Sequence, residues 1–337
     1  MSPTASEIIA MPGLRTRALR RALLAVAAAA ILTLPFWAPG DYFLKVAILA
    51  LTFAVLSTSL NLVFGFAGLL SFAQVGFWGM GAYASALCAV DLSLSPWLSI
   101  AAGGLASATA AVVIGAPALR VSRASFVIVT LSFTLVLALV SRSWVELTRG
   151  PLGIPGLPSL DLSLPGIGTL SGQDPSVFYF FALGLAAFAV GLVWRLTACP
   201  MGRVLLAINQ NEPLARSQGI DATRYQLFAF VVSGLLTGMA GGLYVFHLTI
   251  VDPTIFDTYY TEMLLIIVIL GGPGNLWAVL AASLLFTAIP ELLRVGSEYR
   301  LVLFGAILVA SALAFPRGLG GWLEQRRFDR WRRESRR

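Results

Sequence analysis

Gly202–Gln226 reads GRVLLAINQNEPLARSQGIDATRYQ and separates two hydrophobic stretches, Ser176–Trp194 and Leu227–His247. Each stretch is about long enough to cross a lipid bilayer as a helix. A chain that only reversed its direction between two such helices would need a few polar residues, whereas this segment runs for 25. We therefore interpret it as an element in its own right, shaped for contact with another molecule.

The composition of the chain places it in a membrane. Hydrophobic residues make up 58% of the 337, charged residues make up 12%, and the mean hydropathy is +0.85. Soluble globular proteins carry about 25% charged residues. The hydrophobic runs are continuous and do not alternate with polar residues, which argues against a transmembrane β-barrel. The sequence thus predicts an all-α polytopic membrane protein.

Ten hydrophobic segments predict about 8–10 transmembrane helices, at residues 22–38, 42–62, 68–90, 97–118, 124–141, 177–195, 227–248, 262–272, 276–291 and 300–315. The eighth and ninth segments are short and flank the sequence Gly271-Gly272-Pro273-Gly274-Asn275. Two interpretations stay open there: a tight turn between two spans, or one broken helix that re-enters the membrane. Either way the number of crossings is even.

The arginines orient these helices. Of 23 basic residues 22 are arginine, and twelve of them lie in two terminal tails. If both tails are cytoplasmic, six more arginines (120, 123, 195, 203, 216 and 224) join them, giving 18 of 22 on that side, as the positive-inside rule requires. The charge is thus explained by topology, and no aromatic-basic module indicates nucleic-acid binding.

The predicted domains follow from this topology. A basic cytoplasmic tail occupies residues 1–21, a transmembrane domain occupies 22–316, and a second basic cytoplasmic tail occupies 317–337. Within the transmembrane domain, 142–175 is an outer loop and 202–226 is the cytoplasmic segment. The outer loop is rich in Pro and Gly, and it fits a plain surface loop and a docking or gating segment equally well.

Catalysis is poorly supported by the residues present. His247 is the only histidine, and Cys88 and Cys199 are isolated, so no multi-histidine or CxxC metal site is expected. A G-x-S-x-G motif is absent, which argues against an intramembrane hydrolase. The sole lysine, Lys45, follows Leu44, so the chain has no P-loop for ATP. We expect no enzyme activity and no cofactor or metal bound by this chain itself.

The polar segment is predicted to form two short helices. Arg203–Gln210 makes two amphipathic turns, and Asn211 or Glu212 caps a second helix with Pro213 in its first turn. Gly219 ends that helix, and Asp221 caps the next span. A partner would meet an exposed face containing Arg203, Asn209, Asn211, Glu212 and Arg216. The alternative is an amphipathic hairpin at the membrane surface that has no partner.

Polar residues inside the predicted spans are neutral, and the acidic residues fall near outer ends. This pattern argues against ion-coupled secondary transport, which needs buried ionisable groups. Two interpretations stay open for the neutral residues, a substrate pathway or interhelical hydrogen bonds; the pathway candidates are Asn61, Ser71, Gln74, Phe77, Tyr83, Thr130 and Ser132, with Thr134 nearby. Glycines at 234, 238 and 242 favour close helix packing over a hinge.

A succession of motifs resembles the permeases of ABC importers for branched-chain amino acids, and specifically their LivM-type subunits. The resemblance covers about 42–320, and its strongest part is the polar segment, with Gly202-Arg203, Asn211-Glu212-Pro213, Ala215 and Gly219-Ile220. Further motifs are Leu60–Val63 with Gly65, Ala67–Ser71, Gln74–Phe77 with Gly81–Tyr83, Phe126–Thr130, Leu147-Thr148 with Gly150-Pro151 and Gly153-Ile154, Gly234 with Ala240-Gly241, Gly271-Gly272, and Pro290–Leu292 with Tyr299-Arg300. Two positions depart from the family pattern: Asn209, where arginine is frequent, and Pro273, which interrupts a Gly-Gly-x-Gly stretch.

The resemblance implies a function and partners. The chain would be a multi-pass permease of the bacterial inner membrane, and Gly202, Arg203, Asn209, Asn211, Glu212, Pro213, Ala215, Arg216 and Gly219 would couple it to two ATPase subunits that hold ATP and Mg²⁺. A second homologous permease subunit and a periplasmic binding protein would complete the importer. Urea or short amides are alternative substrates, because their permeases are similar.

Overall fold

The computed structural model describes residues 33–35, 40–164 and 168–292. The chain forms two compact units, 1–44 and 45–337, and the second contains the helical bundle. Apart from three helical residues at 33–35, the predicted span at 22–38 lies outside the described residues. The span at 300–315 and both arginine-rich tails also lie outside them.

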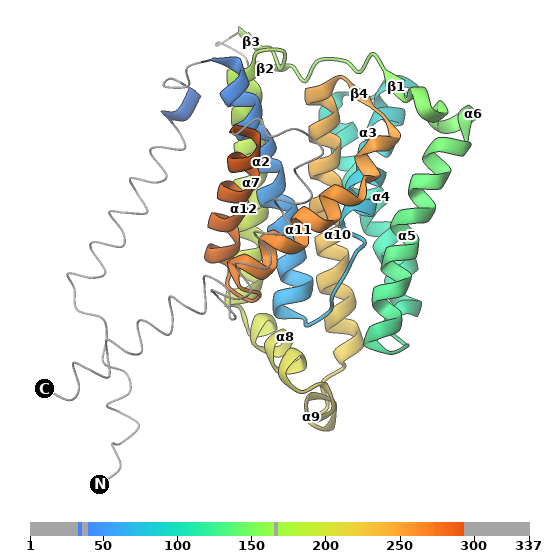
Figure 1. Ribbon diagram of the computed structural model, residues 1–337, viewed down its shortest axis with the longest axis vertical. Helices are drawn as coiled ribbons and strands as arrows, with labels where there is room; N and C mark the ends of the chain where they lie inside the picture. Colours follow the sequence, from blue (N-terminus) through green and yellow to red (C-terminus); the bar gives the residue numbers. More distant parts are fainter. Residues whose placement is uncertain (1–32, 36–39, 165–167, 293–337) are drawn as a thin grey trace, which may run out of the picture. The chain divides into compact units, whose positions relative to one another are not determined.

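The described part is mainly helical (Figure 1). Its longer helices are α2 (Asp41–Asn61), α3 (Gln74–Val90), α4 (Pro96–Ala118), α5 (Arg123–Ser143), α7 (Pro175–Ala198), α8 (Pro200–Gln210), α10 (Ala222–Leu248), α11 (Thr258–Gly271) and α12 (Leu276–Leu292). Short helices are the π-helical η2 (Leu62–Phe66), α6 (Val145–Thr148), η3 (Gly150–Leu152), α9 (Glu212–Ser217) and η4 (Pro253–Phe256). Five helices are long and apolar enough to cross a membrane: α2 continued by η2, α4, α5, α7 and α10. The predicted all-α polytopic fold is confirmed.

The centre of the bundle is built on glycine contacts between α10 and its neighbours α3 and α4. A Cβ on Gly81 would overlap the backbone of Gly238, and a Cβ on Gly241 would overlap the carbonyl of Trp78. Gly238 in turn lies against Ser107 of α4. The absence of side chains therefore sets how closely these three helices approach. The four-residue glycine spacing serves packing, as expected.

The segment before α3 differs from the prediction. A helix was expected from residue 68, but α3 begins at Gln74, and residues 67–73 form an irregular connection. Thr130 and Thr134 of α5 hold this connection: the Phe72 amide donates to Thr130 Oγ1 at 3.2 Å, and Thr134 Oγ1 donates to the Phe72 carbonyl at 2.9 Å. These side chains replace the helical bonds that Phe72 gives up, which makes an unwound segment tolerable inside a membrane protein.

The α11–α12 region forms a helical hairpin. The two helices pack on each other through Ile266, Leu270 and Phe286. The turn between them places both Gly272 and Gly274 at positive φ, +93° and +86°, a conformation that glycine adopts without strain. The Asn275 amide closes the turn by donating to the Gly272 carbonyl at 3.1 Å. Two short helices joined by a turn fit both open interpretations, two spans or one broken helix, so the number of crossings here stays a prediction.

The predicted outer loop contains short regular pieces. Strand β1 (Ile154–Pro155) pairs antiparallel with β4 (Ile250–Val251), and β2 (Leu162–Leu164) pairs antiparallel with β3 (Gly168–Leu170). The first pair ties the loop to the chain that follows α10. Figure 1 shows these strands at one end of α10 and helices α8 and α9 at the other. Short strands of this kind fit a plain surface loop and a docking or gating segment, so both interpretations stay open.

Candidate functional site

The polar segment forms two helices, α8 and α9, named together the α8–α9 segment (Pro200–Ser217). Asn211 caps α9, because its side chain accepts from the Leu214 amide at 3.1 Å. Gly219 follows α9 at φ +82°, and the Asp221 side chain caps α10 by accepting from the Arg224 amide. The predicted caps and the helix end are confirmed. Of the two candidates for the cap of α9, the structure selects Asn211.

The α8–α9 segment is bonded to the bundle through Asn209. Its Nδ2 donates to the carbonyl of Gly65 in η2 at 2.9 Å. Gly68, at φ +74°, lies so close that a Cβ there would overlap the Asn209 side-chain oxygen. The prediction placed Asn209 on the exposed face. That placement is wrong, because the amide is turned inward against the end of α2.

A second attachment joins α9 to α5. Arg123 lies 3.3 Å from Glu212 Oε2, and Arg216 lies 2.7 Å from Glu212 Oε1. The Glu212 side chain is 21% exposed and is shared by two guanidinium groups. It was expected to face a partner, yet it already neutralises charge within the chain. Arg123 was not recognised from the sequence as part of this site, because it lies 89 positions from Glu212 and carries no local signal of the contact.

The remaining exposed surface of the α8–α9 segment is mixed in character. Arg203, Asn211 and Pro213 are exposed, and Arg216 is half-exposed, its side chain at 53%. Leu214 is 59% exposed and Leu206 is 36% exposed. Gly202 and Ala215 are buried and shape the segment from within. The segment thus exposes both apolar and basic side chains, the residue types that protein interfaces often combine.

One step further into the bundle, a second asparagine forms a similar bond. Asn61 Oδ1, at the end of α2, accepts from the amide of Gly274 in the α11–α12 turn at 2.9 Å. Gly65 lies between these contacts, since a Cβ on it would overlap both Asn61 Oδ1 and the Gly274 nitrogen. We call these contacts the asparagine chain, from Asn209 through Gly65 and Asn61 to Gly274. It joins the α8–α9 segment to two other parts of the bundle.

Three of the other pathway candidates, Gln74, Ser71 and Thr130, form hydrogen bonds within the protein. Gln74 Nε2 donates to Ser233 Oγ at 2.6 Å, and Thr237 Oγ1 donates to Gln74 Oε1 at 2.8 Å, which ties α3 to α10. Ser71 Oγ accepts from the Ala73 amide at 3.2 Å, at the start of α3. Thr130 holds the irregular connection before α3. The structure therefore shows hydrogen bonds between distant segments for Gln74 and Thr130, whereas the bond of Ser71 is local. A role of these residues in transport stays untested.

Three pathway candidates make no such bond that ties helices together. Phe77 is fully buried and packs against Phe133 and Phe230, with ring centroids 5.4 and 5.1 Å away. Tyr83 stacks on Phe256 at 6.0 Å. Ser132 lies on the exposed face of α5. The seven candidates are thus spread over the bundle and do not form one cluster. Among the described residues, no group of three His, Cys, Asp or Glu side chains could hold a metal ion.

Comparison with known proteins shows the family to which the chain is similar. The family described as branched-chain amino acid transport system / permease component matches residues 42–312. The high-affinity branched-chain amino acid transport system permease protein LivM of Salmonella typhimurium is 32% identical over 292 residues, covering 81% of this chain and 69% of the relative. The permease protein LivH of the same-named system in that organism is 24% identical over 285 residues, covering 80% and 91%.

A more distant similarity concerns a sugar transporter. The ribose import permease protein RbsC of Bacillus subtilis is 29% identical over 164 residues, covering 44% of this chain and 51% of the relative. No solved structure matches the chain significantly.

Proposed function

Because this chain belongs to the family of permease components of branched-chain amino acid transport systems, we propose that it forms part of the membrane pathway of an ATP-driven importer for branched-chain or related hydrophobic amino acids. It is a transport subunit of a multi-pass membrane protein family, and in this proposal it resides in the bacterial inner membrane. The LivM and LivH relatives are permease proteins of one named system, which supports a second, homologous permease as its partner. Two ATPase subunits bind ATP and Mg²⁺, and a periplasmic binding protein delivers the solute.

The α8–α9 segment carries this proposal. It offers exposed Leu206 and Leu214 beside Arg203 and Arg216, on the side where the arginine distribution predicts the cytoplasm. An ATPase subunit covers this face. The side chain of Glu212 does not bind the ATPase directly; it keeps α9 in place through Arg123.

Motion of the ATPases reaches the pathway through the asparagine chain. A shift of α8 pulls on the Gly65 carbonyl through Asn209, and the end of α2 pulls on the α11–α12 turn through Asn61. Both attached parts belong to the interior of the bundle, where Gly65 and Leu270 are buried. A displacement applied at the surface therefore changes the helix positions around the pathway.

The test uses the complete importer in proteoliposomes, with leucine uptake and ATP hydrolysis measured together. Leu214→Asp places a charge in the covered face, and we expect the ATPase subunits to be lost on purification. Leu152→Asp is the matched control, because Leu152 is 84% exposed and lies in the outer loop. Retention of the ATPases by both variants would exclude the α8–α9 segment as their binding face. Failure of the wild-type complex to import any branched-chain amino acid would refute the proposed substrate.

A further inference from the structure

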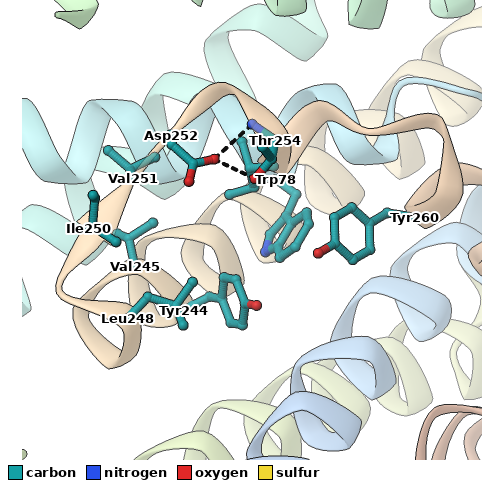
Figure 2. Close-up of a pocket in the computed structure, with 10 residues that line it drawn as sticks. Trp78, Tyr244, Val245, Leu248, Ile250, Val251, Asp252, Thr254 and Tyr260 are labelled. Atoms are coloured by element: carbon teal, nitrogen blue, oxygen red, sulfur yellow. Dashed lines mark hydrogen bonds between the residues drawn. The ribbon is translucent and has the colours of Figure 1, made fainter. Parts of the chain in front are cut away.

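A cavity of about 50 Å³ lies at the end of α10 where Tyr244, Val245 and Leu248 line it. Figure 2 shows the residues around it. Three aromatic side chains come to it from three helices: Trp78 of α3, Tyr244 of α10 and Tyr260 of α11. Aliphatic side chains of α10 and β4 complete its wall, and Asp252 and Thr254 add polar groups. Its volume is room for about four water-sized groups. None of the seven pathway candidates from the sequence lines it.

The aromatic walls are held in fixed positions. Trp78 is fully buried, and its ring centroid lies 5.0 Å from that of Tyr244 and 5.0 Å from that of Tyr260. The interplanar angles are 44° and 80°, so Trp78 contacts one tyrosine ring in a tilted arrangement and the other edge to face. An aromatic face that lines a cavity attracts a positively charged group.

The indole nitrogen of Trp78 is a hydrogen-bond donor without an acceptor among the described residues. Its Nε1 is buried, and no described residue accepts a hydrogen bond from it. Indole N–H groups usually find an acceptor when buried, and they can only donate. The atom that completes this site is therefore a hydrogen-bond acceptor from outside the described chain.

Asp252 contributes a negatively charged hydrogen-bond acceptor to the cavity, in contrast to the N–H donor of Trp78. One carboxylate oxygen accepts from the Thr254 amide at 2.8 Å and from the Thr254 hydroxyl, as Figure 2 shows. The second oxygen makes neither bond, and no basic side chain of the described residues forms an ion pair with Asp252 within 4 Å. A partly exposed carboxylate beside aromatic faces suits a primary ammonium group.

We propose that this cavity binds the head group of a zwitterionic α-amino acid, before the solute passes further along the permease. A carboxylate oxygen of the ligand accepts from Trp78 Nε1–H, and the ammonium group lies between Asp252 and the aromatic rings. The cavity is large enough for the head group alone, so the aliphatic side chain stays toward the opening. The inference rests on the proposed function, and it adds that the permease recognises the part which all amino acids share.

The uptake test uses the complete importer with its binding protein saturated with radiolabelled leucine. Trp78→Phe keeps the ring and removes the N–H, and Asp252→Asn keeps an acceptor for Thr254 and removes the charge. We expect each to reduce leucine uptake at least tenfold while ATPase subunits and binding protein still associate. Matched controls are Trp97→Phe, whose indole already donates to the Asp161 carbonyl at 3.2 Å, and Asp257→Asn, which caps α11. We expect both controls to stay within twofold of wild type.

A binding measurement covers the case in which either variant assembles poorly. Radiolabelled leucine bound to the wild-type membrane complex, purified without the periplasmic binding protein, is displaced by unlabelled leucine, by leucinamide, which lacks the carboxylate, or by 4-methylpentanoate, which lacks the ammonium. We expect both analogues to compete at least tenfold more weakly than leucine. Leu248→Trp, which enlarges a side chain of the cavity wall that is 46% exposed, should abolish binding without loss of assembly.

The outcomes separate the two proposals. Leucine uptake by wild type, together with normal uptake by Trp78→Phe and Asp252→Asn, overturns the cavity assignment and leaves the proposed function intact. Competition by leucinamide and 4-methylpentanoate as strong as that of leucine itself overturns it as well. A wild-type importer that transports no branched-chain amino acid overturns both proposals, whatever the variants do.

Discussion

Gly65 has neighbours on two sides that leave no room for a side chain. A Cβ there would overlap Asn61 Oδ1 and the Gly274 nitrogen, the two atoms that form a hydrogen bond with each other. We expect Gly65→Ala to lower the free energy of unfolding by about 1–3 kcal/mol, the usual cost of overpacking a core. Thermal or denaturant unfolding in one detergent measures this change.

Gly184→Ala is the matched control for this substitution. It lies within α7, and nothing lies within 4 Å of the Cβ that it would gain. Replacing a helical glycine by alanine where space allows stabilises by about 0.5–1 kcal/mol. Equal destabilisation by the two changes would mean that helix content, and not the contact at Gly65, decides the result.

Gln74 distinguishes the two interpretations of the buried neutral residues. Its side-chain amide donates a hydrogen bond to the Ser233 hydroxyl and accepts one from the Thr237 hydroxyl. Gln74→Leu therefore leaves these two buried hydroxyl groups without that partner. We expect a loss of about 1–3 kcal/mol in the free energy of unfolding, with the KM for leucine uptake unchanged in the remaining folded importer. A raised KM without any loss of stability would instead place Gln74 in the substrate pathway.

At the scale of elements, local patterns were sufficient for some features and insufficient for others. The caps of α9 and α10 were predicted because each depends on residues within four positions. The inward turn of Asn209 and the role of Arg123 were missed, because their partners lie 144 and 89 positions away. The start of α3 was misplaced because hydrophobicity is the same for a helix and for an irregular segment whose backbone groups are satisfied by distant threonines.

Asp161, the residue before β2, makes the β2–β3 hairpin sensitive to pH. The pKa of this carboxyl lies below its ordinary value of 3.8, first because the Ser159 hydroxyl donates to it and second because the Gly172 amide does. A lowered pKa in the folded state means that the stabilisation is present above pH 3.8 and is lost as the pH falls below it. We expect the protection of the Gly172 amide against hydrogen exchange to fall only in that acidic range.

Two variants check the assignment. Asp161→Ala should reduce the exchange protection of the Gly172 amide at neutral pH as well, since both acceptors are removed. Asp174→Ala should leave it unchanged, because the side chain of Asp174 does not cap α7. Loss of protection well above pH 3.8 in the wild type would show that another group controls the hairpin.

At the scale of the whole molecule, α10 connects the two sites. Its 27 residues run from the end of the α8–α9 segment to the aromatic cavity, a length of about 40 Å at 1.5 Å per residue. The asparagine chain and the cavity therefore lie at different depths and can be altered separately. Variants of one site should change the use of ATP, and variants of the other should change the handling of the solute.

Asn209→Ala tests the first half of that expectation. It removes the bond to Gly65 and leaves the exposed leucines in place, so we expect the ATPases to stay bound. The number of ATP molecules hydrolysed per leucine imported should rise about two- to tenfold, which corresponds to losing one hydrogen bond of about 0.5–1.5 kcal/mol. Gln210→Ala, an exposed neighbour in α8, is the control, and an equal rise in both variants would contradict the asparagine chain as the link.

The irregular connection at residues 67–73 also bears on how the protein is made. During synthesis this stretch enters the membrane before α5 exists, yet its Phe72 backbone groups depend on Thr130 and Thr134 of α5. Unsatisfied backbone groups in the lipid core cost several kcal/mol each. We therefore expect the newly inserted chain to keep residues 67–73 helical and to unwind them only when α5 arrives, so that biogenesis would pass through a longer α3 than the finished protein has.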